Sequence, residues 1–315
     1  MKKANAYVLL HISVFIFGFT AILGKLIAAS HFALVWNRMW IALPLFFLIP
    51  GFVKRIRAQS VRQMTIYLGI GCIVALHWIT FYGSIKIGNS SSLTLACLGL
   101  SACFTSILEP FFTKEKHQMK DIGLGILALI GMVFISLSNN ENNTAITPEN
   151  FRLAIIWGII TTFLASIFSI LNAKYAKKDS PLVMTFTEMF GGFILLSILM
   201  LLLPLNAKFM DFFQIHSTSI AIEGIDWLWL ILLGTVCTTL AFVLNVSAMK
   251  EVSAFTANIA IGLEPVYGII LALIIFGEGA QFNHYFYIGV LFILSSIVFQ
   301  SYPLLKNKWK RKILT

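Results

Sequence analysis

The chain consists of long apolar runs separated by short polar segments. Eight runs of at least 19 residues contain no Asp, Glu, Lys or Arg: 4–24, 63–85, 87–108, 122–140, 153–173, 189–207, 227–249 and 279–305. Two more runs are long enough when one charge is allowed in each, Arg38 in 26–53 and Glu264 in 252–277. A helix needs about 20 apolar residues to cross a bilayer core. The pattern therefore predicts ten transmembrane helices, at 5–28, 31–52, 64–86, 89–113, 120–138, 152–176, 180–204, 226–249, 252–277 and 283–303.

Composition agrees with this pattern. Hydrophobic residues make up 58% of the 315 residues and charged residues 11%, whereas a soluble domain has about 45–50% and about 25%. So much apolar sequence is typical of an all-α, multi-pass integral membrane protein. The cysteines (Cys72, Cys97, Cys103 and Cys237) all lie in apolar runs without metal-ligand spacing. We therefore expect no metal site, no disulfide framework and no cofactor.

The net charge of +10 indicates orientation rather than a nucleic-acid partner. With the N-terminus inside, 18 of the 23 basic residues fall in the inner segments. Such a bias predicts that both termini are cytoplasmic and that the protein spans the cytoplasmic membrane an even number of times. The basic residues would anchor helix ends at the bilayer surface. A cleaved signal peptide is the alternative for the first run, but that run is longer than a signal h-region.

The chain also repeats itself at a spacing of 163 residues. At this spacing the Gly99–Leu100 pair aligns with the Gly262–Leu263 pair. Ser101 then aligns with Glu264, and Glu115 aligns with Glu278. Two units of five helices each must enter the membrane in opposite directions, because five is odd. We therefore expect two inverted repeats, 1–145 and 146–315, with a solute site near the midplane between them.

Three segments resemble a known family. They are GLSACFTSILEPFFTKEK at 99–116, GLEPVYGIILALIIFGEG at 262–279 and FGFTAILGK at 17–25. Together with the ten-helix plan, they resemble an EamA-type permease of the drug/metabolite transporter superfamily. The resemblance covers nearly the whole chain. It implies a secondary transporter that exports a small organic metabolite, such as an amino acid or a related compound, by alternating access.

Glu264 is the leading candidate for the solute path. It lies about 12 residues into a predicted helix of about 26, near the bilayer centre. A charge there costs at least ~2.5 kcal/mol, so it faces a cavity or a partner. The alternative is a protonated glutamate that locks helices together. Pro265 would bend this helix and free the carbonyl of Ile261.

Further candidates share the predicted depth of Glu264. The third predicted helix contains HWITFYGS at 77–84, in which Trp78 and Tyr82 share one face and His77 lies on the next. Packing is the alternative for this aromatic stripe. Asn245 aligns with Tyr82 in the repeat. The predicted cavity residues are Glu264, His77, Trp78, Tyr82, Asn245, Ser101 and Thr20, on the first, third, fourth, sixth, eighth and ninth helices. Glu264 and His77 are also candidates for proton coupling.

Two other charges within apolar runs have a structural interpretation. Arg38 and Glu188 occupy corresponding helices of the two repeats. We expect them to pair with each other or with backbone carbonyls. Glu115 and Glu278 lie at predicted helix ends, where they are expected to act as caps or loop anchors.

Three other functions are alternatives: an intramembrane enzyme, a channel and a non-transporting membrane scaffold, which would not need Glu264. An intramembrane enzyme needs paired catalytic groups, and the sequence has no His-Glu-x-x-His, Gly-x-Gly-Asp or aspartate-rich motif. A channel would show rings of like residues or a re-entrant filter loop, and we find neither in the sequence. The partners expected are a small-molecule substrate and the lipid bilayer. Both a monomer and a homodimer fit the sequence.

Overall fold

The computed structural model is built entirely from helices in the residues it describes, which are 3–112, 119–138, 146–176, 180–202, 210, 221–249 and 260–313. The first half contains α1 (Lys3–Leu26), α2 (His31–Leu45), η1 (Phe46–Leu48), α3 (Phe52–Arg57), α4 (Val61–Gly88), α5 (Ser91–Leu98), α6 (Ser101–Phe112) and α7 (Met119–Ser136). The second half contains α8 (Pro148–Ala176), α9 (Pro181–Leu202), α11 (Asp226–Gly234), η3 (Thr235–Leu240), α12 (Ala241–Met249), α14 (Glu264–Phe276), η4 (Glu278–Gln281) and α15 (His284–Ile313).

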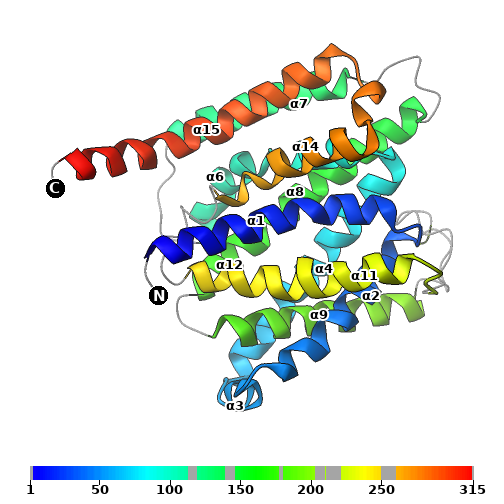
Figure 1. Cartoon of the computed structure of the whole chain (residues 1–315), viewed down its shortest axis with the longest axis vertical. Helices are drawn as coiled ribbons and strands as arrows, with labels where there is room; N and C mark the ends of the chain where they lie inside the picture. The colour runs from blue at the N-terminus through cyan, green and yellow to red at the C-terminus, as the bar shows by residue number, and fades with distance from the viewer. Residues whose placement is uncertain are drawn as a thin grey trace.

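The long helices lie roughly side by side in one bundle (Figure 1). At its centre α4 packs against α8 and α9, while α1 packs against α12 and α14. Helices α7 and α15 pair along one side. The start of α1 and the end of α15 lie toward the same end of the bundle (Figure 1).

Large apolar side chains on the outer faces of the helices are exposed. Leu201 and Ile274, for example, are 76% and 75% exposed. A soluble protein rarely leaves extended apolar faces open, whereas a bilayer solvates them. Six helices in the described residues are long and apolar enough to cross a membrane, and the bent pair α5–α6 adds a seventh. Three shorter apolar helices, within α7, α14 and α15, would raise this number to at most ten if each also crossed the membrane.

Small residues allow the central helices to approach closely. A β-carbon on Gly71 of α4 would collide with the backbone carbonyl of Glu188 on α9. One on Gly18 of α1 would lie 3.2 Å from the Gly268 nitrogen of α14. Membrane helices associate through such contacts because lipid provides no hydrophobic drive between them.

Three predicted helices are interrupted in the structure. The predicted helix 89–113 breaks at the Gly99–Leu100 turn, and α5 and α6 are bent by 46°. The predicted helix 226–249 contains the π-helical stretch η3. In the predicted helix 252–277, residues 252–259 lie outside the described residues, and Gly262 and Leu263 form a turn before α14.

The last interruption corrects the predicted place of Glu264. It is the first residue of α14 rather than a mid-helix residue, and Pro265 follows at the first turn of the helix. Proline is accepted there because the first helical N–H groups have no partner inside the helix. The Gly262–Leu263 turn, rather than a proline kink, therefore interrupts the chain at this level.

One end of the bundle is defined by Lys25, Asn89, Ser90 and Glu278, which contact one another, and is called the Glu278 end below. Helices α1 and α4 finish there, and α5 begins there. Glu278 acts as a cap at this end, as expected from its place after α14. Glu115, its repeat counterpart, lies outside the described residues.

Candidate functional site

A cavity of about 170 Å³ lies inside the bundle at the level of the helix breaks. Its polar wall residues are Thr20, Arg38, His77, Ser101, Thr105, Ser166, Ser169, Asn172, Asn245 and Glu264. Its aromatic wall residues are Phe17, Trp78, Phe81, Phe168 and Phe242. A largely apolar pocket with a few convergent polar groups is the usual form of a small-molecule site.

The cavity extends from the helix breaks toward the end opposite Glu278. Asn172 on its wall is four residues from the last residue of α8, and Met184 is in the first turn of α9. Both positions are far along the helices from the Glu278 end, where α8 begins beside α4.

Two helix starts border the cavity. Ser101 begins α6 directly after the Gly99–Leu100 turn, and Glu264 begins α14 directly after the Gly262–Leu263 turn. A helix start presents backbone N–H groups without intrahelical partners. Both starts therefore bring backbone polarity, together with a polar side chain, to the same apolar space.

Arg38 enters the cavity wall from α2, and its charge is stabilised by protein groups. Its Nε donates to the Thr238 hydroxyl at 2.6 Å, and one terminal nitrogen donates to the Tyr82 hydroxyl at 2.6 Å. The other terminal nitrogen lies 3.4 Å from the Cys237 carbonyl oxygen. Thr238 and Cys237 belong to η3, whose widened turn releases backbone groups for such contacts. The guanidinium carbon lies 3.7 Å from the ring centre of Trp78.

Arg38 and Glu188 do not pair with each other, whereas the alternative expectation, a backbone carbonyl as partner, holds for Arg38 at Cys237. The Glu188 carboxylate instead accepts a hydrogen bond from the side-chain amide of Asn172 at 3.3 Å. Arg38 is bound to α4 and η3 as described above. The two residues thus serve different neighbours, and only Arg38 lies on the cavity wall.

Tyr82 is fully buried behind Arg38 and is not among the wall residues found in the described part of the chain. It was predicted on the cavity face because it shares a helix face with Trp78. In the structure its hydroxyl accepts the Arg38 hydrogen bond and so positions that guanidinium.

His77 is fixed from its Nδ1 side by α8. This nitrogen lies 2.7 Å from the Thr161 hydroxyl and 2.9 Å from the Thr161 carbonyl oxygen. Because the Thr161 hydroxyl donates to the His77 carbonyl, its oxygen remains available to accept from Nδ1–H. A neutral ring with its proton on Nδ1 keeps Nε2 as an acceptor.

The other predicted residues also lie on the wall. Asn245 of α12 donates to the Ser13 hydroxyl of α1 at 3.3 Å. The Thr20 hydroxyl donates to the Phe17 carbonyl in its own helix. The Ser101 carbonyl accepts from the Ser166 hydroxyl at 3.4 Å. These bonds connect α1 with α12, and α6 with α8, around the cavity.

The family comparison decides the class of protein. The model of the EamA-like transporter family matches residues 4–137 and 152–302. The chain belongs to the EamA-like transporter family. Its multi-pass helical bundle and its internal cavity are those of a membrane transporter.

Two curated relatives of this EamA-like transporter have similar length. An uncharacterized transporter of Clostridium kluyveri is 24% identical over 300 residues, which cover 93% of this chain and 91% of the relative. The uncharacterized transporter YetK of Bacillus subtilis is 24% identical over 314 residues, which cover 94% and 86%.

A solved structure shares the fold of this EamA-like transporter. Titled only as the crystal structure of a protein, it aligns with a TM-score of 0.64 at 13% identity. The alignment covers 97% of this chain and 99% of that chain. At this identity the likeness extends to the fold alone.

Sequence reasoning missed several wall residues of this EamA-like transporter. Ser166, Ser169 and Asn172 follow one another at every third position along α8. Residues three apart share a helix face, so this polar stripe was a usable signal. The sequence predicts a structural role for Arg38 rather than a place on the cavity wall, and Met184 of α9 gives no sequence signal. The cavity therefore involves α2 and α9 in addition to the six predicted helices.

Proposed function

We propose that this EamA-like transporter is a secondary transporter that exports a small solute carrying both a positive and a negative group, such as an amino acid. One observation supports this proposal more than any other. Arg38 and Glu264, two opposite charges, lie on the wall of the same cavity. No ion pair of 4 Å or less joins them among the residues the structure describes.

Opposite charges that share a cavity without direct contact suit a dipolar solute. A carboxylate placed near Arg38 and an ammonium group placed near Glu264 would each gain a charge-assisted hydrogen bond. Trp78 and the phenylalanines offer an apolar surface for the rest of the solute. The cavity volume of about 170 Å³ is below the range of about 300–1,000 Å³ typical of sites for drug-sized ligands. It therefore favours a small metabolite.

The two aligned helix starts support the inverted ten-helix plan with repeats 1–145 and 146–315. The turns at Gly99–Leu100 and Gly262–Leu263 are 163 residues apart, the same spacing as the sequence repeat. Discontinuous helices in corresponding positions of two repeats commonly form the solute site of secondary transporters. Alternating access would then tilt one repeat against the other around this site.

Export is the direction that we propose. By sequence, 18 of the 23 basic residues fall in the inner segments of the predicted topology, and an excess of Lys and Arg is typical of cytoplasmic loops. On the proposed topology, in which both termini are cytoplasmic, the cavity would extend toward the cytoplasmic side. It would take up solute there and release it at the Glu278 end. Glu264 and His77 are the groups that would carry a coupled proton.

Transport by purified protein in sealed liposomes tests this proposal. Vesicles loaded with labelled amino acids, and with matched compounds lacking either the amino or the carboxyl group, should lose only the dipolar solutes, and an imposed proton gradient should change the rate. Saturation and counterflow would identify a carrier. Equal passage of all three classes, or linear flux without saturation, would refute it in favour of a channel.

A further inference from the structure

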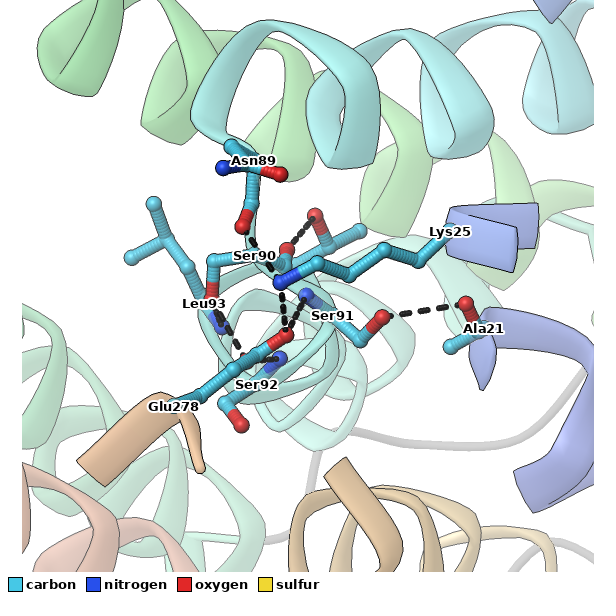
Figure 2. A network of polar contacts seen from close by, with 9 residues as sticks. Ala21, Lys25, Asn89, Ser90, Ser91, Ser92, Leu93 and Glu278 are labelled. Carbon is cyan, nitrogen blue, oxygen red and sulfur yellow. Dashed lines mark hydrogen bonds and ion pairs between the residues drawn. The ribbon is translucent and has the colours of Figure 1, made fainter. Parts of the chain in front are cut away.

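The Glu278 carboxylate is buried in a network of polar contacts at the Glu278 end of the bundle (Figure 2). Its two oxygens accept four hydrogen bonds, each of 2.8 or 2.9 Å, from Lys25 Nζ, Ser90 Oγ, Ser91 N and Ser92 N. The Glu278 side chain is 0% exposed and Lys25 is 15% exposed. The contact is therefore protected from water and fully satisfied by protein groups.

This carboxylate caps a helix that belongs to a distant part of the chain. Ser91 and Ser92 are the first residues of α5, and their N–H groups have no partner within that helix. A negative charge at a helix start also interacts favourably with the helix dipole. Lys25 adds a second link, because its Nζ donates to the Asn89 carbonyl at 2.7 Å as well as to Glu278. The network thus holds α1, α4 and α5 to the end of α14.

Two short helices connect this network to the cavity. Helix α14 runs for 13 residues, or about 20 Å, from Glu264 at the cavity to Phe276, two residues before Glu278. Helix α5 runs for eight residues, or about 12 Å, from Ser91 in the network to the Gly99–Leu100 turn at the cavity. Each helix therefore has one end at the proposed solute site and the other end at Glu278.

The two helices also touch along their length. A β-carbon on Gly268 of α14 would lie 2.5 Å from a methyl group of Leu95 on α5. Such close packing transmits a displacement rather than absorbing it, because packed interiors resist compression. A shift of Glu264 on solute binding would therefore act on the contact between Glu278 and the start of α5.

From these contacts we infer that the bond network of Glu278 with Lys25 and Ser90–Ser92 is the gate that closes the cavity at the Glu278 end. This inference rests on the proposed transport function and adds the element that alternates. Glu278 belongs to the second half of the chain, and its partners belong to the first half. Opening this end requires the halves to separate, which breaks all four bonds together. The gate therefore has two discrete states, open or closed.

Cysteine accessibility tests the gate without any knowledge of the solute. On a background lacking the four native cysteines, Ser101→Cys places a thiol on the cavity wall, and Glu223→Cys identifies the side of a sealed membrane that faces the Glu278 end. Glu223 is exposed and belongs to that end, three residues before α11. A membrane-impermeant maleimide is then applied separately to each side, and the labelling rate is measured.

With Glu278 intact, we expect Ser101→Cys to label mainly from the opposite side. Glu278→Gln should raise labelling from the Glu278 side at least severalfold, because an amide offers one acceptor oxygen to four donors and carries no charge. Glu223→Gln, which removes an exposed charge at the same end, should leave labelling unchanged. Lys25→Met should produce a smaller increase, since the cap on α5 remains.

Equal labelling of folded Glu278→Gln and Glu223→Gln protein would overturn the gate. If Glu278→Gln does not fold, the milder Lys25→Met decides: unchanged labelling from the Glu278 side then refutes the inference. The result is separable from the transport proposal. A labelling change in protein that moves no solute supports the gate and refutes the transport proposal, whereas transport with unchanged labelling does the reverse.

Discussion

The guanidinium of Arg38 stacks on the ring of Trp78, with 3.7 Å between its central carbon and the ring centre. This contact joins α2 to α4 on the wall of the cavity. A planar guanidinium combines such stacking with in-plane hydrogen bonds, whereas a lysine ammonium is a point charge on a flexible stem. The geometry at Arg38 uses both properties.

Arg38→Lys should therefore destabilise the protein. Hydrogen bonds that involve a charged group contribute about 1.5–3 kcal/mol each. Lysine cannot reach Thr238, Tyr82 and the Cys237 carbonyl together, so we expect a loss of roughly 2 kcal/mol or more. Thermal unfolding in detergent measures it. Arg57→Lys on the exposed side of α3 is the matched control, and an equal melting temperature for both variants would contradict the prediction.

Glu264→Gln should keep the fold and lower the initial transport rate about tenfold, which corresponds to about 1.4 kcal/mol. The amide fills the same space but cannot ionise or bind a cation with a full charge. Glu109→Gln on α6, which is not a wall residue, is the control. Transport assayed across a pH series is the measurement. Unchanged transport with an unchanged pH profile would transfer the proton-carrying role to His77.

Alanine substitutions at two glycines of α4, Gly69 and Gly71, should have different effects on stability. At Gly71 a β-carbon would collide with the Glu188 backbone carbonyl, whereas at Gly69 it would have nothing within 4 Å. Overpacking costs typically about 1–3 kcal/mol, so Gly71→Ala should lower the melting temperature and the yield of folded protein. Gly69→Ala should be neutral or slightly stabilising, since alanine favours helix. Similar melting temperatures would show that α4 and α9 are less closely packed than described.

The contribution of Glu278 to stability should depend on pH. Burial raises the pKa of the Glu278 carboxyl, but hydrogen bonds from Lys25 and Ser92 and the Lys25 charge outweigh burial and leave the pKa below its ordinary value of 4.5. The unfolded chain therefore binds a proton more readily than the folded one. The stabilisation is complete above pH 4.5 and is lost as the pH falls through the lower folded pKa.

Melting temperatures of the wild type and Glu278→Gln, measured from pH 7 downward, check this sign. The difference between the two proteins should be largest at neutral pH and should shrink below pH 4.5. Lys25 on α1 is the charged group that faces the carboxylate, so Lys25→Met should reduce the pH dependence. A constant difference down to the most acidic pH would contradict the prediction.

The positions of the helices followed from hydropathy, because burial in lipid demands long apolar runs whatever the tertiary packing. The breaks within these helices were harder to predict from the sequence. Nothing in GLS at 99–101 excludes a continuous helix, since an isolated glycine is tolerated there, so the Gly99–Leu100 turn required the structure. The Gly262–Leu263 turn likewise moved Glu264 from mid-helix to a helix start, and the Glu-Pro pair then became an ordinary helix beginning.

The partners of Arg38 were beyond sequence reasoning for a different reason. They depend on η3, where a π-helical turn redirects the Cys237 carbonyl and the Thr238 hydroxyl. Sequence periodicity assumes 3.6 residues per turn and does not show where a wider turn occurs. The prediction that Tyr82 lines the cavity failed for a related reason. Tyr82 and Trp78 share a helix face, but a shared face does not show which of the two reaches the cavity and which is buried behind Arg38.

Arg38 has its partners within the protein, and this bears on how the carrier completes its cycle. A binding-site cation that relied on the cargo for neutralisation would be costly to bury alone, so such a carrier would reorient only when loaded and would swap one solute for another. Trp78, Tyr82 and η3 stabilise Arg38 whether or not cargo is present. We therefore expect net flux down a solute gradient, without any requirement for solute on the receiving side.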